Sequence, residues 1–229
     1  MAAAPTSSTS APTSSISGFE IVWLEIADEP AAWRAAGFEV DDDGRCVVGT
    51  VEHRLVGRTD GIAGITGWGI VRAGDASTHQ RSIDGIATTA AGDHRCGPPG
   101  VHTAQRGCID HLVIGTPDTP RTAAALRAEG LGQRGHRDTN SEGEAVDMTF
   151  FWAGPVLLEL AGPPTPKVGG GPARLRGVAF ATDRLDELVD RLGDRVTAPR
   201  DAVQAGRRIS ALTEAAGCTT PVAFMTPHR

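Results

Sequence analysis

His111 and Glu159 are the side chains whose types and surroundings point most directly to chemistry. His111 stands in the apolar run Cys108-Ile-Asp-His-Leu-Val-Ile-Gly115, and Glu159 stands in the run Pro155-Val-Leu-Leu-Glu-Leu-Ala161. An imidazole and a carboxylate on buried strands are costly to dehydrate unless they are paired, hydrogen-bonded or bound to a metal. The pair therefore indicates a metal site or a proton-transfer site, and a hydrogen-bonded structural pair is the alternative.

The spacing within the two runs decides whether the two groups can meet. Side chains alternate along a strand, so Ile109, His111 and Val113 share one face, and Leu157 and Glu159 share another. If both faces line one cavity, the imidazole and the carboxylate converge there.

Three further residues are candidates for substrate binding. Trp152 could form the wall of an apolar pocket, although packing in the core is the favoured interpretation. Gln204 could donate a hydrogen bond to a ligand carbonyl or stabilise its own turn. The Arg207 guanidinium could bind a carboxylate or a phosphate. Arg207 and Arg208 are adjacent and point to opposite faces, so at most one enters a cavity, and a solvated strand edge is the alternative.

Three segments that begin alike provide the elements to position these groups. Each has an apolar strand, then an aspartate, then a short helix that ends at a glycine; the strands with their aspartates are Phe19–Asp28, Ile109–Asp118 and Leu175–Asp183. A carboxylate can accept hydrogen bonds from the free amides of a helix's first turn, and glycine readily adopts the left-handed backbone conformation that ends a helix. We therefore predict helix caps at Asp28, Asp118 and Asp183, and helix ends at Gly37, Gly130 and Gly193.

Short strand candidates follow each helix, so the unit reads β-α-β-β-β and repeats three times. A repeated supersecondary unit is a structural signal, because a lone unit leaves one sheet face uncovered. The predicted divisions are a disordered tail at 1–17, a first module at 18–73, a linker at 74–107, a second module at 108–163 and a third module at 173–229.

Composition narrows the classes of function. The chain has 229 residues, a formal net charge of −6 and 40% hydrophobic residues. An acidic chain without a basic cluster is a poor candidate for binding nucleic acid or an anionic membrane, and no run is long enough to span a bilayer. The four cysteines show no zinc-type spacing. They indicate reduced thiols and a cytoplasmic protein.

The repeat, the segment Ile109-Asp-His111 on a first strand and the segment Leu157-Leu-Glu159-Leu160 on a last strand resemble the vicinal oxygen chelate superfamily. This superfamily includes glyoxalase I, bleomycin resistance proteins and extradiol dioxygenases. Two more segments, Ile83–Ile86 and Arg200–Arg208, are similar to segments of glyoxalase-like proteins of high-GC bacteria. The resemblance implies an α+β fold in which βαβββ modules form curled mixed, mostly antiparallel sheets around a cup.

In catalytic members of the superfamily, a divalent metal at the floor of the cup is held by a His and a Glu from each of two paired units. The resemblance therefore implies His111 and Glu159 as ligands of Zn, Ni, Fe or Mn, with Glu159 as a catalytic group. The third unit departs from this pattern, because Gly177 aligns with His111, and Ala223 or Phe224 lies near the Glu159 position. Two protein ligands are fewer than a catalytic metal site normally has.

The resemblance thus leaves two functions open. The first is a glyoxalase-like protein that binds a small oxygenated molecule in the cup, as a metal-dependent lyase, isomerase or dioxygenase relative with a degenerate metal site. The second is a metal-free protein that binds or sequesters a small molecule, as bleomycin resistance proteins do. In both cases we expect a small-molecule partner and a homodimer.

Overall fold

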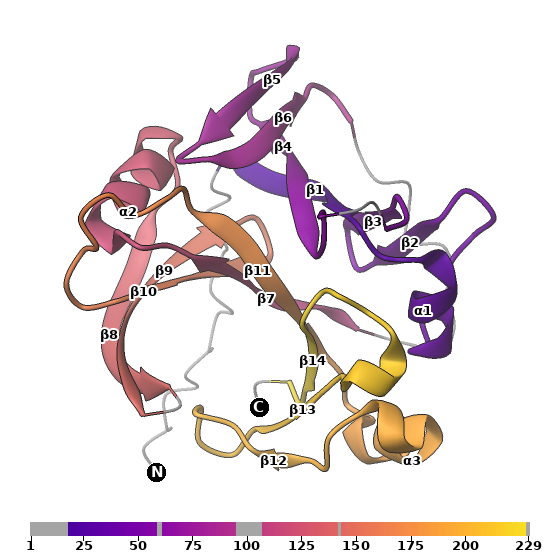
Figure 1. Ribbon diagram of the computed structural model, residues 1–229. Coiled ribbons are helices and arrows are strands. Elements are labelled where there is room, and N and C mark those ends of the chain that lie inside the picture. Colours follow the sequence, from indigo (N-terminus) through magenta and orange to yellow (C-terminus); the bar gives the residue numbers. More distant parts are fainter. Residues whose placement is uncertain (1–17, 59–60, 95–106, 142, 228–229) are drawn as a thin grey trace, which may run out of the picture.

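The structure is a computed structural model that describes residues 18–58, 61–94, 107–141 and 143–227 (Figure 1). The disordered tail predicted at 1–17 lies outside the described residues. Within the described part, no helix combines the length and the apolar character that crossing a membrane requires.

Two mixed sheets make up the fold. The N-terminal sheet has six strands in the spatial order β2-β3-β1-β4-β6-β5, and the C-terminal sheet has eight in the order β12-β13-β14-β11-β7-β10-β9-β8. The six strands are β1 Phe19–Ile26, β2 Arg45–Val48, β3 Val51–Leu55, β4 Ile65–Arg72, β5 Thr78–Ile83 and β6 Ile86–Ala91. The eight strands are β7 Cys108–Gly115, β8 Gln133–Ser141, β9 Glu144–Ala153, β10 Val156–Gly162, β11 Arg174–Ala181, β12 Arg200–Asp201, β13 Arg208–Ala211 and β14 Val222–Met225. The α+β class is confirmed, whereas the predicted curled sheet is corrected to two open mixed sheets.

The eight-stranded sheet contains the predicted βαβββ unit twice. β7 pairs in parallel with β10, the last strand of its unit, and β11 pairs in parallel with β14. The two first strands, β7 and β11, then pair antiparallel at the centre of the sheet. This central pair positions the candidate site, because His111 lies on β7.

The six-stranded sheet does not repeat that unit. β1, α1, β2, β3 and β4 follow one another in the predicted order, but β1 pairs in parallel with β3 rather than with the last strand, β4. β4 instead pairs antiparallel with β1 and in parallel with β6. The linker predicted at 74–107 therefore contains β5 and β6, and the pairing gives no third equivalent βαβββ unit among the described residues.

In the described part of the chain, the remaining elements are three α-helices and two short 3-10 helices: α1 Pro30–Ala35, α2 Thr119–Ala128, α3 Leu185–Leu192, and the 3-10 helices Gly193–Arg195 and Glu214–Ala216. The cap predicted at Asp118 is confirmed, since its carboxylate accepts from the Arg121 amide at 3.0 Å. The caps predicted at Asp28 and Asp183 are wrong. Residue 29 caps α1 and residue 184 caps α3, both without a side-chain hydrogen bond.

Asp28 has a different role, because it joins the two sheets. Its buried carboxylate accepts from the Trp33 indole at 3.1 Å, from the Thr219 amide at 2.6 Å and from the Thr220 amide at 3.2 Å. Burial raises the pKa of Asp28, but a hydrogen bond from the Thr219 hydroxyl at 2.6 Å and the three bonds above outweigh it and hold that pKa below its ordinary value. An ionised group beside α1 is thus satisfied by the segment that leads into β14.

Aromatic side chains fill the core between the sheets. Trp33 of α1 and Phe38 pack with ring centroids 4.6 Å apart, and Phe38 contacts Phe180 of β11 at 5.2 Å and Phe224 of β14 at 5.9 Å. His53 of β3 also lies in this cluster, 5.4 Å from the Phe180 ring. One continuous apolar core therefore covers one face of the eight-stranded sheet and leaves the other face for a site.

Candidate functional site

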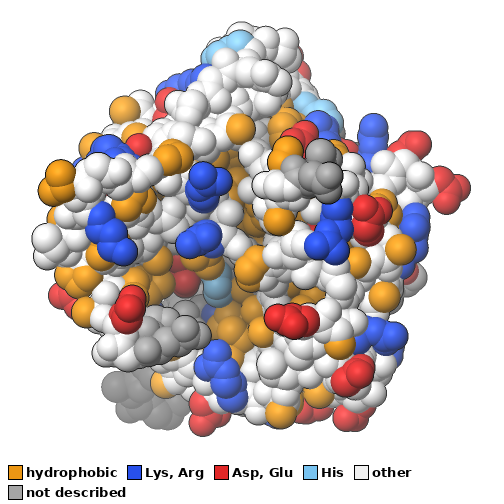
Figure 2. Space-filling view, viewed as in Figure 1, with side chains coloured by type: hydrophobic (Ala, Val, Ile, Leu, Met, Phe, Trp, Pro, Cys, Tyr) orange, Lys and Arg blue, Asp and Glu red, His pale blue; other side chains and the backbone are white. Residues whose placement is uncertain are grey.

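The two faces of the eight-stranded sheet differ sharply in exposure. One face is the core face, with Leu112 and Leu158 both 0% exposed. The other, which we call the open face, carries the side chains that alternate with these residues. The register aligns Leu157 with both His111 and Trp152, so these three lie in a row across β7, β10 and β9. The open face is half-buried with Trp152 at 39% exposure, and Figure 2 shows a hollow with hydrophobic side chains and a histidine side chain in it.

The structure brings His111 and Glu159 together on the open face. The register pairs Glu159 with Val113, two residues beyond His111 on the same side of β7. His111 Nε2 lies 3.8 Å from Glu159 Oε2, and the exposed fractions of the two side chains are 12% and 9%. The convergence expected from alternation on two separate strands is therefore what the structure has.

A β-bulge adds a third group that alternation did not predict. Between β7 and β11 the register passes from Ala179–His111 to Phe180–Ile109, so Asp110 is the extra residue on β7. Bulges re-aim side chains by breaking the alternation of a strand. The Asp110 carboxylate therefore reaches His111 Nδ1 at 2.9 Å.

Arg207 secures Asp110 from the other side. Its guanidinium forms a bidentate ion pair with the Asp110 carboxylate, and its Nε donates to the Thr226 carbonyl at 2.7 Å. Burial raises the pKa of Asp110, but the hydrogen bonds from His111 and Arg207 outweigh it and hold that pKa below its ordinary value. The ionised Asp110 carboxylate accepts a hydrogen bond from His111 Nδ1, which turns Nε2 toward Glu159 and the open face.

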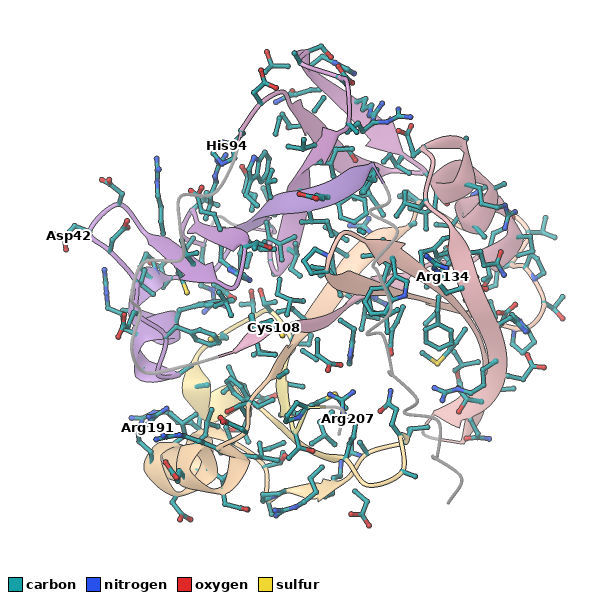
Figure 3. The ribbon with its side chains drawn as sticks, turned by 180° about the vertical axis from the view of Figure 1, so that it is seen from behind. Asp42, His94, Cys108, Arg134, Arg191 and Arg207 are labelled. Atoms are coloured by element: carbon teal, nitrogen blue, oxygen red, sulfur yellow. The ribbon has the colours of Figure 1, made fainter. Side chains whose placement is uncertain are left out.

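The three residues predicted to bind substrate, Trp152, Gln204 and Arg207, lie in three different environments. Trp152 borders the open face beside Leu157. Gln204 lies in the turn before β13, where its main-chain carbonyl accepts from the Arg207 amide at 3.2 Å. Arg207 is 3% exposed, so the solvated strand edge considered for it is wrong. Figure 3 shows Arg207 in the interior of the molecule, whereas Arg191 and Asp42 lie at its rim.

The donor set does not fit the divalent metal that the resemblance implies. His111 and Glu159 are two donors, and the Asp110 carboxylate is already engaged by Arg207 and His111. The residue paired with His111 on β11 is Ala179, which offers no ligand atom. Among the described residues, no group of three or more His, Cys, Asp or Glu side chains is placed to hold a metal ion.

The described cysteines are not nucleophiles of this site. Cys46, Cys108 and Cys218 are free thiols. Burial raises the pKa of Cys46 and of Cys218 to about 12 in each case, and burial also raises the pKa of Cys108. A raised pKa keeps a thiol protonated and unreactive.

Comparison of the fold with solved structures gives several matches that cover most of the chain. A mutant of 4-hydroxymandelate synthase from Streptomyces coelicolor matches with a TM-score of 0.62 and 14% identity, over 92% of this chain and 93% of that one. An extradiol ring-cleaving dioxygenase from B. fuscum matches with a TM-score of 0.62 and 15% identity, over 93% of this chain and 72% of that one. A homoprotocatechuate 2,3-dioxygenase variant from B. fuscum matches with a TM-score of 0.61 and 13% identity, over 94% and 74%.

These likenesses show the fold alone, because the identities are low. The sequence itself matches no protein-family model and no curated protein. The chain therefore has the vicinal oxygen chelate fold, as its sequence motifs predicted.

Proposed function

We propose that this protein binds a small oxygenated molecule on the open face of its eight-stranded sheet, with His111 and Glu159 as the polar anchor. The observation that carries the proposal is the placement of His111 Nε2 and Glu159 Oε2 3.8 Å apart on a half-buried face, beside the apolar side chains of Leu157 and Trp152. Small-molecule sites commonly combine apolar walls with a few convergent polar groups. A molecule with two neighbouring hydroxyls could donate one hydrogen bond to each acceptor.

The same geometry supports proton transfer as a second candidate function. Asp110 fixes the orientation of the His111 ring, and Arg207 fixes Asp110, so Nε2 is held toward the open face. A general base needs a defined orientation and a partner within hydrogen-bond reach of the proton. In this candidate, one proton passes from the bound molecule either to the Glu159 carboxylate or to His111 Nε2, which leaves the molecule as an anion. Arg207 is a positioning residue with no direct contact to the molecule.

Binding should be tested first with thermal-shift measurements on a set of vicinal diols, catechols and 2-hydroxy acids. Ligands that stabilise the protein would then be titrated by calorimetry into His111→Gln and Glu159→Gln variants. We expect each variant to weaken binding about tenfold, because each hydrogen bond to an ionised or polar anchor contributes roughly 1.5 kcal/mol. His79→Gln, on exposed β5, is the matched control and should bind as the parent does.

A titration with Zn²⁺, Ni²⁺, Fe²⁺ and Mn²⁺ discriminates the proposal from the metal-dependent reading. Micromolar binding of one of these ions, lost in both His111→Gln and Glu159→Gln, would show that two protein donors suffice to hold a metal. It would overturn the proposal that the small molecule binds directly to His111 and Glu159. If no oxygenated molecule binds a folded sample, or if hits bind both variants with unchanged affinity, the open face is not the binding site. The homodimer stays a prediction, testable by light scattering.

A further inference from the structure

A second hollow lies where the two sheets meet, beside the open face. It is a cavity of about 720 Å³ lined by the segment 61–66 that leads into β4, the start of β6, and the start of β11, with Val113 of β7 at its end. The Ala173 amide donates to the Asp84 carbonyl at 2.8 Å, which fixes the entry of β11 against the β5–β6 turn. The cavity is therefore bounded by both sheets.

Two arginines of β11 line this cavity. Arg174 is paired with Gly115 of β7, and Arg176 is the extra residue of a second β-bulge, since the register passes from Leu175–Ile114 to Gly177–Val113. Both bulges of the β7–β11 pair thus insert a charged residue, Asp110 in one and Arg176 in the other. In each case the bulge takes that side chain out of the regular alternation of its strand.

Gly115 leaves the space that the Arg176 side chain occupies. The arginine crosses Gly115 so closely that a Cβ built on that glycine would lie 2.7 Å from Arg176 Cγ and 2.9 Å from its Nε. A side chain at position 115 would displace the arginine. The glycine therefore allows the arginine stem to lie across β7, beside Val113 and the cavity.

The cavity is cationic although the whole chain is acidic. Its described lining contains Arg174 and Arg176 and no Asp or Glu. Both arginines are exposed, and among the described residues neither guanidinium makes a hydrogen bond or an ion pair with another side chain. Figure 2 shows basic side chains beside a hollow whose floor is hydrophobic. By contrast, Arg208 on β13 is paired with the Asp186 carboxylate.

We propose that this cavity is a binding site for the carboxylate or phosphate group of a small organic anion, held by Arg174 and Arg176. Guanidinium groups bind both anions through paired, charge-assisted hydrogen bonds. The side chain of Ile62, 50% exposed, and the ring of Pro172 give the organic part of such a ligand an apolar wall.

The position of Val113 connects this site to the open face. Val113 lies two residues beyond His111 on the same face of β7, a distance of roughly 7 Å along a strand. A ligand anchored at the two arginines could therefore extend its oxygenated end to His111 and Glu159. This extension rests on the proposed function, whereas the anion site itself stands on the cavity and its arginines.

The test is calorimetric titration of the full chain with phenyl phosphate and with benzoate, and with benzyl alcohol as the neutral counterpart. We expect one or both anions to bind and benzyl alcohol to bind at least about tenfold more weakly. The double variant Arg174→Gln/Arg176→Gln should lose at least about tenfold in anion affinity, as expected when charge-assisted hydrogen bonds are removed. Arg191→Gln, which makes the same charge change per site on α3 at the rim of the molecule (Figure 3), should stay within about twofold.

The comparison of phenyl phosphate with benzoate assigns the anion class. The proposal is overturned if neither anion binds, if benzyl alcohol binds equally well, or if the double arginine variant binds as the parent does. Anion binding that is lost in His111→Gln but kept in the double arginine variant would place the anion on the open face and also overturn it. If His111→Gln and Glu159→Gln keep anion binding and no neutral diol binds, the proposed function is wrong but the anion site is supported.

Discussion

At the scale of single residues, the contact between Arg207 and Asp110 is the one on which the candidate site depends. Both side chains are largely buried, at 3% and 11% exposure, and each satisfies the other's charge. Removing one partner of a buried ion pair leaves an uncompensated charge, which is far more costly than losing an exposed pair. The orientation of His111 is therefore coupled to the stability of the fold.

This coupling predicts a large effect of Asp110→Asn. We expect it to lower the free energy of unfolding by about 3 kcal/mol, because the buried Arg207 guanidinium loses its counter-charge. Asp186→Asn removes an exposed partner from the neighbouring Arg208 and should cost less than about 1 kcal/mol. Urea denaturation of both variants measures the difference, and equal losses would refute the structural importance of the buried pair.

His53 predicts a dependence of stability on pH. Burial lowers the pKa of His53 from 6.5 to about 4, against the raising effect of hydrogen bonds at Cys46 and Val51. Between about pH 6.5 and 4 the unfolded chain binds a proton here that the folded chain does not, so stability is full above 6.5 and falls as the pH decreases. The expected slope from this residue is roughly 1.4 kcal/mol per pH unit.

The matched variant is His53→Phe, which keeps an aromatic ring in the cluster with Trp33 and Phe180 but cannot be protonated. Denaturation curves recorded across this pH range should lose that part of the slope in His53→Phe and retain it in His79→Gln. An unchanged slope in His53→Phe would mean that acid lability comes from other groups.

At the scale of elements, helix caps provide a matched comparison. Asp118→Ala should cost about 1 kcal/mol, because the Arg121 amide at the start of α2 loses its acceptor. Asp183→Ala should change stability by only a few tenths, since residue 184 occupies the cap of α3 without a side-chain hydrogen bond. Thermal unfolding measures both. A loss at Asp183 as large as that at Asp118 would contradict this assignment.

Elements with strong apolar periodicity could be predicted from the sequence, and polar edge strands could not. The apolar runs around His111 and Glu159 were found as β7 and β10. β8, with the sequence Gln-Arg-Gly-His-Arg-Asp-Thr-Asn-Ser, and β5 lie at the edges of their sheets. Such strands are stabilised by pairing with a neighbouring strand rather than by a hydrophobic pattern of their own. The sequence pattern therefore predicted neither β5 nor β8.

The candidate site could be predicted only where its residues follow the regular alternation of side chains along a strand. Alternation along β10, and along β7 beyond its bulge, places His111 and Glu159 on one face, and this convergence is present. Ile109, which was predicted on the same face as His111, lies instead in the core, because the bulge at Asp110 separates the two residues. Asp110 and Arg176 were missed because each sits in a bulge, and a bulge depends on the register with the partner strand. The adjacency of Asp110 to His111 was visible in the sequence, but its orientation was not.

At the scale of the whole molecule, Asp28 is a buried polar connection between the N-terminal and C-terminal parts. Asp28→Ala should cost about 3 kcal/mol or more, because the Trp33 indole and the amides of Thr219 and Thr220 lose a shared buried acceptor. We also expect broader denaturation curves, as the two sheets become less cooperative. Asp75→Ala, which removes an exposed carboxylate, is the control, and equal effects of the two substitutions would contradict this role.

The Asp28 contacts also have a consequence for synthesis. The carboxylate and its amide partners are separated by 191 and 192 residues. During translation, Asp28 leaves the ribosome long before residues 219 and 220 do, so water hydrates its carboxylate until that segment has emerged. The N-terminal sheet therefore acquires its full set of buried hydrogen bonds only after the segment before β14 has been synthesised.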